Sequence, residues 1–355
     1  MRVVVIGGTG NFGTRICRRL GQETGLEILP AARSARPGVV PLDLSGADFA
    51  ARLAALAPQL VIHCAGPFQG QDYGVARATL AAGAHYLDLA DGRDFVVRFA
   101  AAVGPAANAA RRCAVSGAST LPALSSAVVD HLLPQFTRLD SIDIVIAPGQ
   151  QAPRGAATLA GVFSYAGRAF RWWRGGAWKT AHGWQEIEKR RFSFGTRVAA
   201  ACDVPDLELL PPRYPGVRDV TFRAALEVPV QHHALWLVAA MRRIGLPLPL
   251  ERWAPRLDRW ATWLDRFGSS RGGMTVELAG LGTHGRSHRL RWEIVAPDNH
   301  GPEIPCMAAV LLAGRLARGD APPTGARACM GLLALEDFAP EFARWGMDTR
   351  IEAGA

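Results

Sequence analysis

The first 130 or so residues alternate between short apolar runs and segments whose apolar residues recur at helical spacing. The run Val3–Ile6 is entirely apolar, as in a parallel strand buried on both faces, and Phe12, Ile16 and Leu20 then follow along one helix face. Further strands are predicted at 26–32, 39–44, 60–64, 85–89 and 113–116, and helices at 48–56, 72–82 and 121–133. This alternation predicts an α/β domain of the Rossmann type, with a doubly wound parallel sheet.

From Ser141 the pattern changes to a two-residue period. Residues 142–146 alternate in the way that is typical of a half-exposed strand. Extended runs at 220–230, 275–281 and 289–295 fit a second α+β domain with a mixed sheet, and Met307–Leu316 predicts a late helix. We therefore predict a Rossmann domain over 1–135, completed by the late helix around 303–331, an α+β domain over 136–302 and a C-terminal tail over 332–355.

Another helical pattern spans residues 253–267. Its apolar positions are Trp253, Leu257, Trp260, Leu264 and Phe267. Arginines flank this face at Arg252, Arg256, Arg259 and Arg266. Such a helix packs in a core or a subunit interface, or it lies on a membrane surface. Asp258 and Asp265 interrupt the basic face, which favours core or interface over peripheral membrane contact.

A glycine-rich turn joins the first strand to the first helix: Gly7-Gly8-Thr9-Gly10-Asn11-Phe12-Gly13. Gly8, Gly10 and Gly13 have the G-x-G-x-x-G spacing of dinucleotide-binding turns. The first glycine permits a tight turn, the second lets the backbone approach a pyrophosphate, and the third lets the helix pack on the strand. The helix N-terminus adds free N–H groups and a partial positive charge. We expect these seven residues to bind a dinucleotide, the alternative being an ordinary glycine-rich turn.

Basic residues follow the second strand. NAD sites usually place an acid near the end of this strand for the ribose 2′-hydroxyl, whereas a cation accommodates a 2′-phosphate. Glu27 lies at the other end of the strand, so Arg33, Ser34 and Arg36 predict NADP(H) rather than NAD(H). The fourth strand runs into Ala65-Gly66-Pro67, where a glycine and a proline let the backbone pass close to the cofactor.

Length, charge and cysteine usage narrow the class of protein. The chain has 355 residues, enough for two domains, and a net charge of +9. Its densest basic run is only Lys189-Arg190-Arg191, so we expect no nucleic-acid partner and attribute the charge to an anionic small molecule. No apolar stretch approaches the length of a membrane span, and Arg2 leads straight into a strand, which predicts a soluble, cytoplasmic protein. The scattered cysteines predict reduced thiols and no metal site.

The assembled segments resemble the saccharopine dehydrogenase-like reductases. The resembling motifs are the glycine turn over 7–13, Ala65-Gly66-Pro67-Phe68 and Gly83-Ala84-His85-Tyr86-Leu87-Asp88-Leu89. The second half contributes Arg154-Gly155-Ala156-Ala157-Thr158, Arg271-Gly272-Gly273-Met274 and Gly301-Pro302-Glu303-Ile304-Pro305. The resemblance implies an NAD(P)-binding domain, a substrate and dimerisation domain, and a homodimer. It also implies hydride exchange with C=N bonds of amino-acid-derived imines, while a related branch reduces C=C bonds of lipid precursors.

Three residues are candidates for the chemistry around a substrate. Asp91 follows the fifth strand and would face the ligand crevice, although it also fits the N-cap of the next helix. Arg271, like Arg154, stands beside glycines, where a guanidinium can bind a substrate carboxylate through two hydrogen bonds. His300 lies in a polar turn and would relay a proton, or serve the turn itself.

The residues predict an NADP(H)-dependent oxidoreductase, and the resemblance implies that it transfers hydride to or from the C=N bond of an amino-acid-derived imine. The Tyr-x-x-x-Lys motif of ordinary carbonyl reductases is absent, and an iminium needs orientation more than a strong acid. Two alternatives stay open. One is reduction of an activated C=C bond in a lipid-like substrate, in a channel lined by Trp172, Trp173, Trp178 and Trp184. The other is a non-catalytic NADP-sensing protein, because no acid–base pair is evident.

Overall fold

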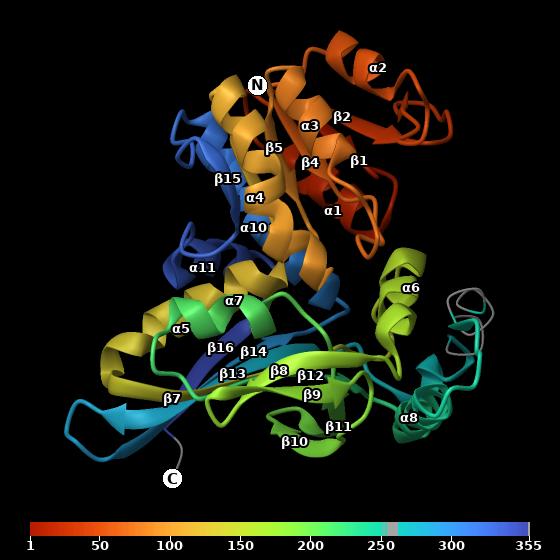
Figure 1. Cartoon of the computed structure of the whole chain (residues 1–355). Coiled ribbons are helices and arrows are strands. Elements are labelled where there is room, and N and C mark those ends of the chain that lie inside the picture. The colour runs from red at the N-terminus through yellow and green to blue at the C-terminus, as the bar shows by residue number, and fades with distance from the viewer. Residues whose placement is uncertain (251–252, 254–261, 354–355) are drawn as a thin grey trace. The chain divides into compact units, whose positions relative to one another are not determined.

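The computed structural model describes residues 1–250, 253 and 262–353. The chain divides into two compact units, each made of two separate stretches of sequence (Figure 1). The first unit comprises Met1–Leu124 and Glu303–Leu333, and the second comprises Ser125–Pro302 and Ala334–Ala355.

The first unit is built on a parallel sheet in the order β15-β6-β5-β4-β1-β2-β3. Its strands are β1 (Arg2–Ile6), β2 (Glu27–Ala32), β3 (Val40–Pro41), β4 (Leu60–His63), β5 (His85–Asp88), β6 (Cys113–Ser116) and β15 (Gly325–Ala328). Its helices are α1 (Asn11–Leu20), α2 (Phe49–Ala55), α3 (Gly74–Ala81), α4 (Arg93–Ala110) and α10 (Ile304–Ala317). The expected Rossmann-type doubly wound sheet is confirmed.

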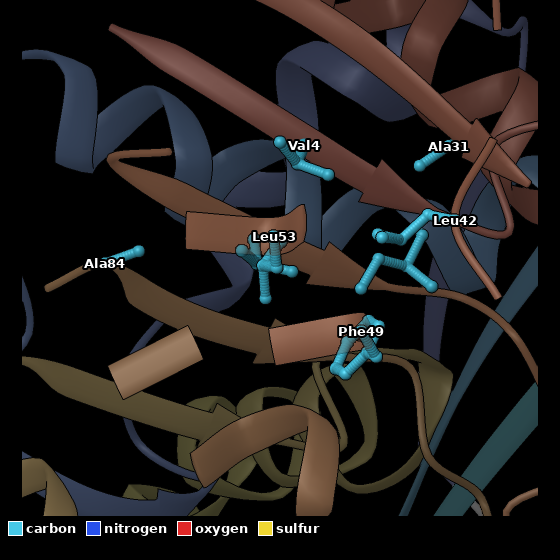
Figure 2. Packing of buried hydrophobic residues seen from close by; sticks show 8 residues of the cluster. Val4, Ala31, Leu42, Phe49, Leu53 and Ala84 are labelled. Carbon is cyan, nitrogen blue, oxygen red and sulfur yellow. The ribbon is translucent and has the colours of Figure 1, made fainter. Parts of the chain in front are cut away.

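The position of β1 in the core of this unit explains why its sequence is a continuous apolar run. Val3, Val4 and Val5 are fully buried, because β1 has neighbours on both sides and helices on both faces. Figure 2 shows one of the two faces, where Val4 of β1 packs with Leu53 and Phe49 of α2. Burial of these side chains is the main source of the unit's stability.

The second unit contains a mixed sheet in the order β10-β11-β12-β7-β13-β14-β16, and β8 pairs with β12 and β9. The strands are β7 (Phe136–Ala147), β8 (Ala169–Arg174), β9 (Ala177–His182), β10 (Glu188–Phe192), β11 (Gly195–Ala201), β12 (Asp219–Leu226), β13 (Gly272–Gly282), β14 (Ser287–Ala296) and β16 (Asp348–Ala353). The helices are α5 (Ser125–Leu132), α6 (Ala156–Tyr165), α7 (Asp206–Arg213), α8 (Pro229–Arg243) and α11 (Leu335–Arg344). β12 and β7 run parallel while the other pairs are antiparallel, so the predicted α+β domain with a mixed sheet is confirmed.

Several predicted segments take a different form. Residues 332–355, expected as a tail, instead contain α11 and β16, and β16 pairs with β14. Every residue of β16 is exposed, which explains why it carries no apolar signal. The helix predicted at 121–133 is a π turn (Thr120–Leu124) followed by α5. The helix predicted at 253–267 lies mostly outside the described residues, which include Trp253 and 262–267.

Among the described residues, no helix combines the length and the apolarity that crossing a bilayer requires.

Candidate functional site

The first unit has its topological switch point between β1 and β4. From β1 the chain proceeds through β2 and β3 to one side, and β4, β5 and β6 extend the sheet to the other. In open α/β sheets, ligands bind beyond the carboxyl ends of the strands at this point. The glycine turn follows β1 there, and the loop 64–67 follows β4.

The glycines of the turn are required by close approaches of backbone. Gly7 has a φ of +78°, and a Cβ on it would lie 2.9 Å from the nitrogen of Ala65. A Cβ on Gly13 would lie 2.1 Å from the carbonyl oxygen of Gly7, so α1 packs directly on the turn. A Cβ on Gly8 would meet the backbone of β2 at 2.9 Å. The left-handed conformation of the turn therefore falls on Gly7, while Gly13 has the packing role expected of it.

Gly10 is the most open of the four glycines in the turn. It is exposed, it is the N-cap of α1, and the nearest atom to a Cβ on it would be the oxygen of Gly7 at 3.2 Å. The first hydrogen bond within α1 runs from the nitrogen of Thr14 to the oxygen of Gly10, at 3.0 Å. The amides of Asn11, Phe12 and Gly13 precede that bond, and the first turn of α1 carries no acidic residue. Together with the exposed Thr9, this end of the helix presents backbone and a partial positive charge suited to an anion.

The carboxyl end of β2 is tied to the same turn. The nitrogens of Gly7 and Gly8 both donate to the oxygen of Ala31, at 2.9 and 3.0 Å. Arg33, Ser34 and Arg36 follow this point directly and are all exposed.

Glu27 lies at the opposite, amino end of β2. There it pairs with Arg2 at 2.8 Å, so its carboxylate is engaged away from the turn. The acidic residue therefore lies at the amino end of β2 and the arginines follow its carboxyl end, as the sequence predicts.

A glutamine that the sequence analysis did not single out holds the loop after β4. The side chain of Gln71 donates to the oxygens of Ala65 and Pro67, at 2.8 and 2.7 Å. The loop also joins β1, because the nitrogen of Cys64 donates to the oxygen of Ile6 at 2.8 Å. No local sequence signal marks Gln71, whose role depends on how the loop folds back.

Behind the loop lies a buried polar group formed by β4, β5 and β6. Asp88 accepts hydrogen bonds on Oδ1 from Gly117 N, Ala90 N and Ser116 Oγ, at 2.7, 3.0 and 2.9 Å. Burial nevertheless raises the pKa of Asp88 to about 6. The Tyr86 hydroxyl lies 3.1 Å from His63 Nδ1, and burial lowers the pKa of His63 to about 4. These side chains are part of the core of the first unit.

Asp91 is exposed at the carboxyl end of β5, on the loop that precedes α4. Its Oδ1 accepts a bond of 3.3 Å from Gln69. The N-cap of α4 is Gly92, and Asp91 lies one residue before it, so the helix-cap alternative is wrong. Asp91 belongs to the first unit, whereas Arg271 and His300 belong to the second.

Arg271 and His300 lie on adjoining loops of the second unit. The nitrogen of Asn299 donates to the oxygen of Ser270 at 3.0 Å, which joins the two loops. Arg271 is exposed and lines a cavity of about 350 Å³, whose other lining residues are Ser193, Phe194, Val295, Pro297, Asp348 and Arg350. His300 Nδ1 lies 3.0 Å from the oxygen of Trp345, to which it donates, so this histidine also supports the turn.

Other candidates from the sequence serve the second unit itself. Arg154 pairs with the carboxylate of Asp265, so its guanidinium already has a carboxylate partner within the chain. Trp172 and Trp184 are 5% and 1% exposed, and Trp184 packs against His232. Trp173 donates to the oxygen of Val217 at 2.9 Å. Core packing accounts for Trp172 and Trp184.

Comparisons with known proteins identify the fold of this chain. No protein-family model and no curated protein sequence matches the chain. Among solved structures, saccharopine dehydrogenase (L-Glu forming) from Saccharomyces cerevisiae matches with a TM-score of 0.68 and 10% identity, over 100% of both chains. Diaminopimelate (DAP) dehydrogenase of C. glutamicum matches with a TM-score of 0.49 and 14% identity, over 96% of this chain and 98% of that one.

The yeast structure shows that this chain has the fold of saccharopine dehydrogenase along its whole length. The resemblance seen in the sequence is thereby confirmed at the level of the fold, and function has to be argued from the site.

Proposed function

We propose that this protein is an NADP(H)-dependent oxidoreductase that transfers hydride to or from the C=N bond of an amino-acid-derived imine. The observation that carries the proposal is the position of the glycine turn at the switch point. Ala31 joins this turn to the carboxyl end of β2, which Arg33 and Arg36 follow directly. The shared fold supports it, because the yeast relative is by name a dehydrogenase of saccharopine that forms L-Glu.

The residues of the first unit fit a dinucleotide. The open backbone at Gly10 and the first turn of α1 would hold the pyrophosphate, and Ala65-Gly66-Pro67 would flank the cofactor on the β4 side. Arg33, Ser34 and Arg36 would bind the 2′-phosphate, since guanidinium groups form paired, charge-assisted hydrogen bonds with phosphate oxygens. The bound nicotinamide supplies or accepts the hydride.

The residues proposed to act on the substrate have separate tasks. Arg271 would anchor a substrate carboxylate, because its guanidinium is exposed beside a cavity. His300 would accept or return a proton at Nε2, since its Nδ1 donates to Trp345. Asp91 would contribute a negative charge opposite an iminium. Hydride addition to an iminium gives the neutral amine directly, so that step needs no proton donor.

A substrate panel tests the reaction class. We expect NADPH to be oxidised with carboxylate-bearing imines, and Arg271→Ala to raise the KM for them while leaving the affinity for NADPH unchanged. Turnover confined to enals would instead indicate C=C reduction. Tight NADPH binding without turnover on any compound would indicate a sensing protein.

The cofactor preference is tested by Arg33→Ala. Losing a charge-assisted contact to the 2′-phosphate should weaken NADPH binding by about tenfold or more and leave NADH binding nearly unchanged. Calorimetric titration with both nucleotides measures the two affinities. Arg98→Ala is the control, since Arg98 is an exposed arginine of α4 that faces Asp94 at 3.8 Å. Equal weakening of NADPH and NADH in Arg33→Ala would rule out contact with the 2′-phosphate.

A further inference from the structure

Exposed large apolar side chains gather in one stretch of the second unit. Among the described residues, those outside this stretch are Ile187 and Ile351. Those inside it are Val230, Leu237, Ile244, Leu246, Trp253, Trp263 and Phe267. Single exposed apolar residues are ordinary on protein surfaces, but here seven of them fall within fewer than 40 residues of sequence.

One side of α8 carries much of this apolar surface. Val230, Leu237 and Ile244 follow one another at intervals of seven residues, so they lie along the same side of the helix and its C-terminal end. Their exposed fractions are 71%, 54% and 79%. The helix is held to the unit by other residues, such as the fully buried His232 and Ala239. The apolar side of α8 is therefore available to a partner.

A second apolar element lies beside the start of α8. Trp263 and Phe267 are 63% and 62% exposed, and the Arg266 guanidinium lies 4.0 and 4.7 Å from the centroids of their rings. The chain then turns back to α8, because the nitrogen of Ser269 donates to the carboxylate of Glu227 at 2.9 Å, two residues before α8 begins. We call Val230, Leu237, Ile244, Trp263 and Phe267, with Arg243 and Arg266, the α8 surface.

Among the described residues, the α8 surface itself carries two arginines, Arg243 and Arg266, and no acidic residue. The sequence of α8 contains no acidic residue and ends in Arg242-Arg243. Asp265, the acid beside the two exposed rings, is held by Arg154 and by Gln150, whose side chain donates to it at 2.9 Å. This pattern is complementary to a partner that carries negative charge. It favours a partner whose outer layer is anionic and whose interior is apolar.

We propose that the α8 surface docks on bilayers that contain anionic phospholipids. Val230, Leu237 and Ile244 enter the boundary between headgroups and acyl chains, as the apolar face of an interfacial helix does. Trp263 and Phe267 lie at the level of the headgroups, and Arg243 and Arg266 contact lipid phosphates. The contact is peripheral, in keeping with the lack of a membrane-crossing helix among the described residues. The proposal does not depend on the oxidoreductase activity.

The test is sedimentation of the full chain with vesicles of phosphatidylcholine, alone or mixed with phosphatidylglycerol. We expect partitioning onto the mixed vesicles that weakens as salt is added. The double variant Ile244→Ser/Phe267→Ser should lower partitioning by about tenfold or more, since both side chains leave water on docking. Arg243→Gln/Arg266→Gln should lower it by about fivefold for each charge removed.

The control is Ile351→Ser, which removes an apolar side chain of 45% exposure from β16, outside the α8 surface. Its partitioning should equal that of the unmodified chain, and thermal unfolding of all variants checks that each is folded. Failure to bind mixed vesicles, or equal partitioning of every variant, overturns the proposal. A dimer that dissociates in Ile244→Ser/Phe267→Ser, without any vesicle binding by the unmodified chain, identifies a second copy as the occupant and overturns it too.

Discussion

Replacing Gly13 by alanine is expected to weaken nicotinamide-cofactor binding strongly and to destabilise the first unit. The added Cβ would lie 2.1 Å from the oxygen of Gly7, 2.7 Å from its carbonyl carbon and 2.8 Å from Gly8 Cα. All three are backbone atoms, so no side chain is able to rotate away, and either α1 or the turn has to move. We expect NADPH affinity to fall by about a hundredfold or more, and the free energy of unfolding to fall by about 2 to 4 kcal/mol.

Gly104→Ala supplies a matched control within the same unit. Gly104 lies inside α4, and a Cβ on it would have no heavy atom within 4 Å. Alanine should stabilise the helix there by about 0.5 to 1 kcal/mol and leave cofactor binding unchanged. Denaturant unfolding and fluorescence titration with NADPH measure both properties. If Gly13→Ala retained full affinity for NADPH, the cofactor would have to bind elsewhere.

We expect the stability of Asp88→Asn, relative to that of the unmodified chain, to increase from acid to alkaline pH. Burial raises the pKa of Asp88 from an ordinary value of 3.8 to about 6. The folded chain therefore binds this proton more tightly than the unfolded chain does. The stability contributed by the protonated carboxyl is fully present below pH 3.8 and is lost as the pH rises through about 6. By pH 8 the loss amounts to about 3 kcal/mol, at about 1.4 kcal/mol for each pKa unit.

The amide of asparagine does not ionise and therefore avoids this loss. Its oxygen is able to accept the three bonds that Oδ1 of Asp88 accepts from Gly117, Ala90 and Ser116. The buried His63 also titrates, but it is present in both proteins, so its contribution cancels in the difference.

Denaturant unfolding from pH 4 to pH 8 measures this effect. The difference in unfolding free energy between Asp88→Asn and the unmodified chain should grow toward alkaline pH by up to about 3 kcal/mol. Asp94→Asn, which removes the same charge from an exposed position of α4, is the control. A difference that is constant across this range would show that Asp88 stays ionised in the fold.

Much of the fold followed from local pattern. The first unit was predictable because strands that are buried on both faces read as uninterrupted apolar runs, as in Val3–Ile6, and because glycines punctuate the turns. β16 was not predictable, because its stability comes from backbone pairing with β14 while its side chains stay exposed. A strand of that kind leaves no trace in the periodicity of the sequence.

Residues of the site were predictable where they follow a strand directly in the sequence. The glycine turn and Arg33 follow β1 and β2, so the parallel topology brings them to one edge of the sheet. The contact between His63 and Tyr86 depends instead on the register of β4 against β5, which no local pattern specifies. His300 is similar, since its partner Trp345 lies in a segment that carried no structural prediction.

The two interrupted units have a consequence for the order of folding. One edge of β6 stays unpaired until β15, at residues 325–328, has been synthesised. In the same way, one edge of β14 stays unpaired until β16, at residues 348–353, has been synthesised. Neither sheet is therefore complete before these late strands have been synthesised. Pairing over such sequence distances slows folding and leaves strand edges open to aggregation.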